Sequence, residues 1–128
     1  RIRQVLPKSI MLPAVGQGAL GLETRANDEG TRRAIAPLND AASHACVTAE
    51  RALLRRLEAG CLAPVGCLAT LEVQGTLELR GAVLSTDGRI RLSAVATGPT
   101  AAPQELGAQL ADQLLSLGAA ELIKQAHA

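Results

Sequence analysis

The 128-residue sequence contains no phenylalanine, tyrosine or tryptophan. Its hydrophobic core must therefore be built from leucine, valine, isoleucine and alanine, and it offers no aromatic platform on which nucleic-acid bases could stack. The charges are almost balanced, with 13 basic and 12 acidic residues and a formal net charge of +1. A net charge this small creates no field that would attract nucleic acid or an anionic membrane, so we expect neither as a partner.

Cysteine is scarce and unpaired. There are three cysteines, an odd number, and no two of them form a CxxC pair. This usage argues against a disulfide framework and a structural zinc site, and it favours a reducing compartment, so we expect a cytoplasmic protein. No apolar run is long enough to span a membrane, and the N-terminus lacks the pattern of a signal peptide. The chain starts at Arg1 rather than at a methionine, so we expect its natural beginning to be missing.

One reactive side chain, Cys61, lies in a stretch that glycines and a proline enclose, GCLAPVG at residues 60–66. Residues 40–58 have a helical pattern, so Cys61 follows a helix end that Gly60 can close with a positive φ, and Pro64 prevents the helix from resuming. A helix C-terminus presents partial negative charge and does not favour a thiolate. Such a thiol is suited to capturing one reactive electrophile and keeping it. From position alone, a small apolar residue that closes a turn is the favoured interpretation.

Residues 14–21, AVGQGALG, formally contain the GxGxxG pattern of dinucleotide-binding proteins. That pattern requires a strand directly before the glycines and a helix that opens on them. Here Pro13 precedes the glycines, and residues 20–25 continue with strand-like alternation, so we reject a dinucleotide site. The glycines are interpreted as a flexible crossover in which Gln17 is the polar side chain, able to donate and accept hydrogen bonds. The alternative is that Gln17 only bonds nearby backbone in a turn.

Two helices are predicted before the cysteine loop. The first is short and begins at the N-cap Asp28, and the second is capped by Asn39 or Asp40. Small and aliphatic residues recur on the second helix at spacings of three and four, which predicts one apolar face: Ala42, Cys46, Ala49, Leu53 and Leu57. Cys46 is therefore expected to be a buried small hydrophobic residue.

The hydrophobic period changes from 3.6 to 2 after the cysteine loop. Strands are predicted over residues 68–74, 76–84 and 89–96, joined through Gly75 and through a turn at residues 86–88. Apolar and charged residues alternate along the second and third strands. The pattern predicts a three-stranded antiparallel meander with one face in water.

A further helix is predicted to open at Pro103 and to be interrupted by Gly118. Its leucines would cover the apolar face of the sheet: Leu106, Leu110, Leu114 and Leu117. Cys67, at the beginning of the sheet, is expected to pack in the core. The predicted fold class from residue 40 onward is α+β, with a small three-stranded antiparallel sheet covered on one face by helices.

Five short blocks of sequence are specific when taken together. In chain order they are LPAVGQGA (residues 12–19), ExR (23–25), TAERA (48–52), LEAGC (57–61) and PVG (64–66). Together they resemble the porphobilinogen deaminase (hydroxymethylbilane synthase) family, in the family's order and through essentially the whole chain. The resemblance implies the C-terminal part of that transferase.

The resemblance divides the chain in two. Residues 1–39 would be the end of domain 2, the crossover loop and a return strand and helix of domain 1, segments that belong to the α/β domains of the full enzyme. Residues 40–128 would be the cofactor-carrying domain 3.

In that family the cysteine of the corresponding loop carries a dipyrromethane cofactor through a thioether bond, which implies this role for Cys61, with one cofactor per chain. Deamination of porphobilinogen gives an azafulvene, the kind of electrophile that a thiol captures once. The family adds four porphobilinogen units to this primer with loss of ammonia and releases hydroxymethylbilane in tetrapyrrole (heme) biosynthesis. The resemblance also implies cofactor contacts for Gly60 and Gln17.

The chain departs from the family in two positions and lacks earlier parts of the family sequence. Ala59 replaces a usual glycine, and Cys67 stands where many members have a small polar residue; neither affects the attachment site. The family's catalytic aspartate and the basic cluster for the acetate and propionate side chains belong to those earlier parts. We therefore assign no catalytic residue in this chain and expect it to be inactive without the remaining N-terminal domains.

Two other classes of protein are alternatives. A free-standing α+β interaction domain would leave Cys61 unmodified. A Cys/His metal module lacks ligands at workable spacing, since His44 has no second histidine or acid placed beside it, and we assign no metal site. Residues 1–39 are expected to be partly disordered or repacked on their own, because their apolar side chains would lose their natural partners.

Overall fold

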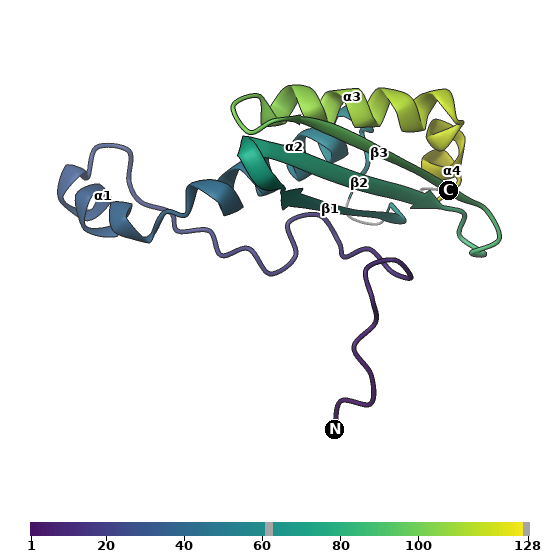
Figure 1. The fold of residues 1–128 in the computed structure, drawn as a ribbon, viewed down its shortest axis with the longest axis horizontal. Coiled ribbons are helices and arrows are strands. Elements are labelled where there is room, and N and C mark those ends of the chain that lie inside the picture. The colour runs from purple at the N-terminus through teal and green to yellow at the C-terminus, as the bar shows by residue number, and fades with distance from the viewer. Residues whose placement is uncertain (61–62, 127–128) are drawn as a thin grey trace.

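The computed structural model describes residues 1–60 and 63–126 (Figure 1). Helices and a single meander follow one another along the chain: α1 (Glu29–Ile35), η1 (Ala36–Leu38), α2 (Ala41–Arg56), β1 (Val65–Leu71), η2 (Val73–Gly75), β2 (Thr76–Leu84), β3 (Arg91–Pro99), α3 (Pro103–Ser116) and α4 (Ala119–Ala126). The strands form an antiparallel sheet in the order β1-β2-β3. The predicted α+β class is confirmed.

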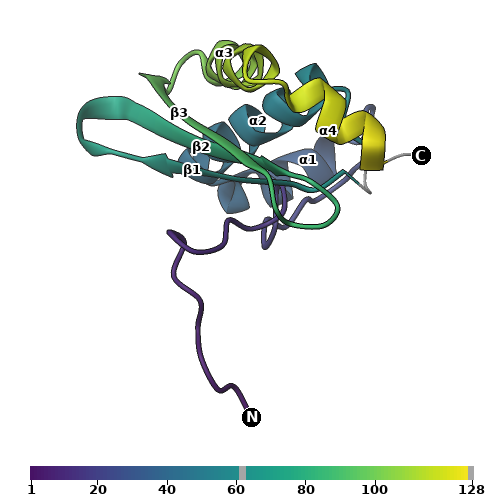
Figure 2. The same ribbon diagram turned by 90° about the vertical axis from the view of Figure 1, so that its right-hand side faces the viewer.

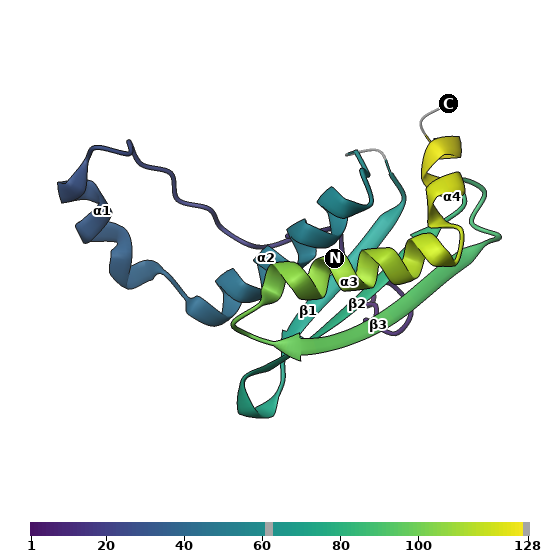
Figure 3. The ribbon, with the colours of Figure 1, turned by 90° about the horizontal axis from the view of Figure 1, so that it is seen from above.

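Helices α2 and α3 lie against one face of the sheet, and the N-terminal segment leaves on the opposite side (Figures 1 and 2). Helix α2 packs on β1 and on α3, and α3 packs on β2 and β3. Helix α1 lies beyond the beginning of α2, away from the sheet (Figure 3). The prediction that helices cover one face of the sheet is therefore confirmed.

Aspartate caps begin the two predicted helices. Asp28 Oδ1 accepts a hydrogen bond from Thr31 N at 3.0 Å, and Asp40 Oδ1 accepts one from Ser43 N at 2.7 Å. Asp40, rather than Asn39, is thus the cap of α2. The hydrogen bonds from Thr31 and from Ser43 hold the pKa of Asp28 and of Asp40 below the usual value, because they stabilise the charged carboxylate.

The core lies between the sheet and α2 and α3. Its largest fully buried side chains are Leu53, Leu77, Leu79, Leu110, Leu114, Val83 and Cys67. Two expectations need correction. On α2 the buried stripe includes Ala45, whereas Ala42 and Cys46 are half-buried. Leu117 was expected to cover the sheet but is 54% exposed, because it is the C-cap residue and lies beyond the last turn of α3.

The strand boundaries differ from the prediction at both ends of the meander. β1 begins at Val65 rather than at residue 68. Leu84 N donates to Pro64 O at 3.0 Å, so the pairing of β1 with β2 starts directly after Pro64. β2 was predicted correctly at Thr76–Leu84. In the described part of the chain, residues 20–25 form no strand despite their alternation.

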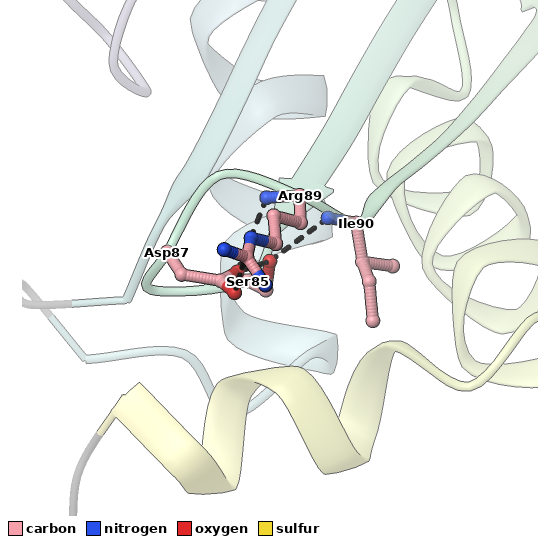
Figure 4. Close-up of polar contacts among 4 residues, drawn as sticks. All are labelled: Ser85, Asp87, Arg89 and Ile90. Carbon is pink, nitrogen blue, oxygen red and sulfur yellow. Dashed lines mark hydrogen bonds and ion pairs between the residues drawn. The ribbon is translucent and has the colours of Figure 1, made fainter.

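The turn between β2 and β3 is built from side-chain hydrogen bonds (Figure 4). Ser85 Oγ donates to Asp87 Oδ1 at 2.6 Å and accepts from Ile90 N at 2.9 Å, while Arg89 N donates to Asp87 Oδ1 at 3.1 Å. The bond from Ser85 is the main cause that keeps the pKa of Asp87 below its usual value. Because the amides of Arg89 and Ile90 are bonded within this turn, β3 begins at Arg91 and not at residue 89.

Helix α2 and helix α3 approach closely at Gly107, which lies in the interior of α3. A Cβ atom placed on Gly107 would lie 2.6 Å from Ala52 Cβ and 2.8 Å from Leu53 N, and still closer to Ala49 O. Real Cβ atoms do not approach backbone atoms so closely. The absent side chain therefore sets the distance between the two helices.

None of the helices in the described residues combines the length and the apolar character that a membrane span requires.

Candidate functional site

The loop that carries Cys61 is fixed at both of its ends. Cys61 and Leu62 themselves lie outside the described residues. On the near side, Ala59 N donates to Leu54 O at 3.3 Å, and on the far side Ala63 N donates to Gly60 O at 3.1 Å. Ala59 and Ala63 both pack against the core. The chain on either side of the cysteine is thus anchored to the domain.

The turn that ends α2 lies two residues before the one expected. Glu58 has a φ of 52° and therefore takes the left-handed conformation. The sequence pattern predicted this conformation for Gly60. Ala59 avoids the left-handed region, so the alanine at this position bears no strain from a positive φ.

The crossover loop places Gln17 between two glycines in left-handed conformations. Gly16 has a φ of 67° and Gly18 a φ of 83°, which explains why both are glycine. Gln17 N donates to Ala14 O at 3.1 Å, and the side chain of Gln17 is exposed. In the described chain, no strand directly precedes these glycines and no helix opens on them.

Glu50 joins the crossover loop to the sheet. Its side chain is buried, with only 6% of the residue exposed, and its two oxygens accept from different segments. Oε2 accepts from Gly16 N at 2.7 Å, and Oε1 accepts from Ala69 N in β1 at 2.8 Å. Both carboxylate oxygens are therefore satisfied by backbone amides, as a buried charge requires.

The segment before Gly16 also lies along β1. Cys67 N donates to Pro13 O at 2.9 Å, and a Cβ on Gly66 would be 3.1 Å from Leu12 Cβ. Two outer amides of β1, those of Cys67 and Ala69, thus donate to Pro13 and to Glu50, so this part of the sheet edge is covered by the protein itself. Residues 12–16 and the strand that follows the cysteine loop consequently form one packed unit.

One pocket adjoins this unit, and a second lies farther along the crossover loop. A pocket of about 520 Å³ lies between residues 10–14, residues 63–66 and the turn at residues 84–91, and its lining is apolar apart from Ser85, Thr86 and Arg91. A second, of about 750 Å³, lies between residues 18–24 and the helices α1 and α2, and Arg32, His44 and Arg51 contribute to it. His44 is exposed, as expected for a surface residue.

Two family models match this chain. The model described as the porphobilinogen deaminase C-terminal domain matches residues 44–116, more than half of the chain. The chain belongs to the porphobilinogen deaminase family. The model described as the dipyromethane cofactor binding domain of porphobilinogen deaminase matches residues 1–33. Gln17 falls in the second match, and Cys61 falls in the first.

Curated relatives agree over nearly the whole chain. The porphobilinogen deaminase of Chlorobaculum tepidum is 45% identical over 126 residues, covering 96% of this chain and 40% of the relative. That of Chlorobium luteolum is 47% identical over 129 residues, and that of Desulforudis audaxviator 43% over 128 residues, each with 41% of the relative covered. The chain spans about two-fifths of the length of the curated relatives that it matches.

The two described cysteines of this family member are poor nucleophiles. Burial raises the pKa of the Cys67 thiol, which is fully buried in β1, and the nearby Glu50 charge raises it further. Burial also raises the pKa of the half-buried Cys46, with added effects of Glu50 and Asp40. Since the thiolate is the reactive form, neither thiol is suited to capture an electrophile at neutral pH. Cys67 packs in the core, as predicted.

The raised pKa of Cys67 predicts a loss of stability at alkaline pH. Below the ordinary thiol pKa of about 8.5 the thiol is protonated in both states, and the stability is fully present. As the pH rises above that value the unfolded chain releases the proton while the folded chain holds it, so the free energy of unfolding falls. We expect the urea midpoint to drop between pH 7 and pH 9.5. The same midpoint should change less with pH in Cys67→Ala, and an equal pH dependence in both chains would contradict this cause.

The described residues contain no group of three histidine, cysteine or acidic side chains placed to hold a metal ion.

Sequence reasoning missed Glu50, although a signal for it exists. Glu50 stands four residues after Cys46 and three before Leu53, so it continues the apolar stripe of α2. A carboxylate at such a position must find buried donors. Its donor at Gly16 lies 34 residues away in the sequence, where a local pattern does not reveal it.

Proposed function

We propose that this chain is the C-terminal part of a porphobilinogen deaminase, a transferase that joins four porphobilinogen units with loss of ammonia and releases hydroxymethylbilane. The observation that carries the proposal is the family match over residues 44–116, which include the cysteine loop. The chain covers about two-fifths of its relatives' length, so the activity would belong to the complete protein. No catalytic residue is assigned within this chain.

Cys61 is the proposed attachment site of a dipyrromethane cofactor. Its sulfur would add to the methylene carbon of the azafulvene that porphobilinogen forms when ammonia leaves. A carbon–sulfur bond forms, and the thiol proton balances the nitrogen that the azafulvene had left unprotonated. The raised pKa values of Cys46 and Cys67 support this assignment, because they leave Cys61 as the remaining thiol of the chain. When bound, the dipyrromethane would supply the primer to which further units are added.

Gln17 and Gly60 are the other proposed cofactor contacts. Gln17 lies on a loop that two left-handed glycines hold in a turn, and its side chain is exposed. The side-chain amide is therefore accessible to a ligand, to which it could donate and from which it could accept hydrogen bonds. The carbonyl of Gly60 accepts from Ala63 N, which supports a role in shaping the loop around the sulfur. The cations that would neutralise the acetate and propionate groups belong to the remaining part of the enzyme.

We propose a domain boundary at residues 39 and 40. Asp40 caps α2, and the buried core begins at Ala45, so residues 40–128 would form the cofactor-carrying domain. Residues 1–39 would complete the other domains of the enzyme. Large apolar side chains of that segment are exposed here, in agreement with a surface that those domains cover: Ile2, Val5, Leu6, Ile10, Met11, Leu20, Leu22 and Leu38. The free thiols of Cys46 and Cys67 support a cytoplasmic location.

Fragment complementation tests the proposed function. The chain alone is expected to form no hydroxymethylbilane from porphobilinogen, because it lacks the groups for proton transfer and carboxylate binding. Mixed with the portion of a relative that it does not match, it is expected to restore product formation, measured by chromatography with mass detection. The control is that portion alone. Turnover by the isolated chain, or no product from the mixture, would contradict the proposal.

A further inference from the structure

Glu50 makes contacts that an ordinary helix glutamate does not make. It lies in the middle of α2, yet it is buried, and neither oxygen bonds its own helix. One oxygen accepts from the crossover loop and the other from the edge strand β1. The side chain of Glu50 thus bonds two residues that are 53 positions apart in sequence, Gly16 and Ala69. Neither hydrogen bond is needed to form α2.

The chemistry of these contacts requires a carboxylate. Both partners are N–H donors, at 2.7 Å and 2.8 Å, so the group between them must accept on both sides. A glutamine would accept on one side and would turn its own NH₂ donors toward the other amide. Hydrogen bonds to a charged acceptor are the stronger kind, and a buried amide left without its acceptor is costly.

The contact acts on the loop at the residue that sets its conformation. Gly16 begins the turn that carries Gln17 and has a φ of 67°, and its amide has Glu50 as its partner. Three residues earlier, Pro13 O accepts from Cys67 N. The loop is therefore held to β1 directly at Pro13 and through Glu50 at Gly16. β1 begins at Val65, four residues after Cys61.

We propose that Glu50 is the positioning residue of the crossover loop: through Gly16 it fixes Gln17 relative to the domain that carries Cys61. Glu50 does not touch the cofactor or substrate in this account. The functional part of the inference rests on the proposed function, whereas the positioning itself is a property of this chain and is tested on it alone.

Amide hydrogen exchange of the isolated chain tests the positioning directly. In Glu50→Gln the amide of Gly16 is expected to exchange about tenfold faster or more, because it loses a charge-assisted bond. Amides in the middle of β2, such as that of Leu79, are expected to keep their protection. The matched control is Glu105→Gln, an exposed glutamate on α3, which should leave Gly16 unchanged. Should the glutamine variant not fold, Glu50→Asp, which keeps the charge but is shorter by one methylene, carries the same test.

Unchanged exchange at Gly16 would overturn the proposal, as would an equal acceleration at Gly16 and Leu79, which would mean a general loss of stability. In the complemented mixture, Glu50→Gln is expected to lower the rate of bilane formation while the mass added at Cys61 stays the same. An unchanged rate would overturn the link to Gln17. Failure of the unsubstituted mixture to form product would instead count against the proposed function, and the exchange experiment would still decide the role of Glu50.

Discussion

An alanine at position 107 is expected to destabilise the domain by about 3 kcal/mol or more, a large part of the stability of an ordinary domain. In an open helix this change would stabilise, because alanine restricts the unfolded chain more than glycine does. Here the added Cβ would meet Ala52 Cβ at 2.6 Å and Leu53 N at 2.8 Å. Backbone atoms of α2 cannot move aside unless the two helices separate. We expect a lower thermal midpoint and a lower urea midpoint, measured by circular dichroism.

Gly30→Ala is the matched control for this prediction. Gly30 lies in α1, and a Cβ there would have Asp28 Oδ1 as its nearest neighbour at 3.6 Å, an ordinary contact. Its stability should be unchanged or slightly higher. Equal midpoints for Gly107→Ala and the unsubstituted chain would mean that α2 and α3 do not cross as closely as described.

Cys61→Ala is expected to reduce bilane formation in the complemented mixture to background. An alanine has no sulfur to form the thioether, so the growing pyrrole chain would have no anchor. The comparison is Cys46→Ala, which removes a half-buried thiol of raised pKa and should keep the activity. Product is measured by chromatography with mass detection, at equal concentrations of folded chain.

Full activity of Cys61→Ala would show that this thiol is not the anchor. Loss of all activity in a well-folded Cys46→Ala would indicate that the wrong cysteine has been assigned. Alanine is smaller than cysteine, so neither substitution introduces a steric clash, and a change in activity can be attributed to the loss of the thiol.

Local sequence patterns were sufficient for most elements of this fold. Asp28 was predicted as one cap, and Asn39 or Asp40 as the other, because a short polar side chain before an apolar-periodic run bonds the free amides of a first turn. The structure shows Asp28 and Asp40 in these positions. The bounds of β2 followed from the alternation of apolar and charged residues over residues 77–81 and from the turns on either side. The start of β3 was wrong because alternation continues through Arg89 and Ile90, whose amides the side chains of Ser85 and Asp87 bind.

The candidate site depends more on contacts between distant residues. Cys61, Gln17 and Gly60 were identified from motifs, and their roles remain predictions. Glu50 was missed because its position on the apolar stripe of α2 does not reveal its partners, which come from the crossover loop and from β1. The need for glycine at position 107 likewise depends on where α2 lies, and no pattern within α3 contains that information.

Peptide mapping with intact mass of the complemented mixture, supplied with porphobilinogen, tests the central claim most directly. The account predicts a mass increase of two linked pyrrole units on the peptide that contains Cys61, with the peptides of Cys46 and Cys67 unmodified. An unmodified Cys61, or the same mass increase on Cys46 or Cys67, would contradict it.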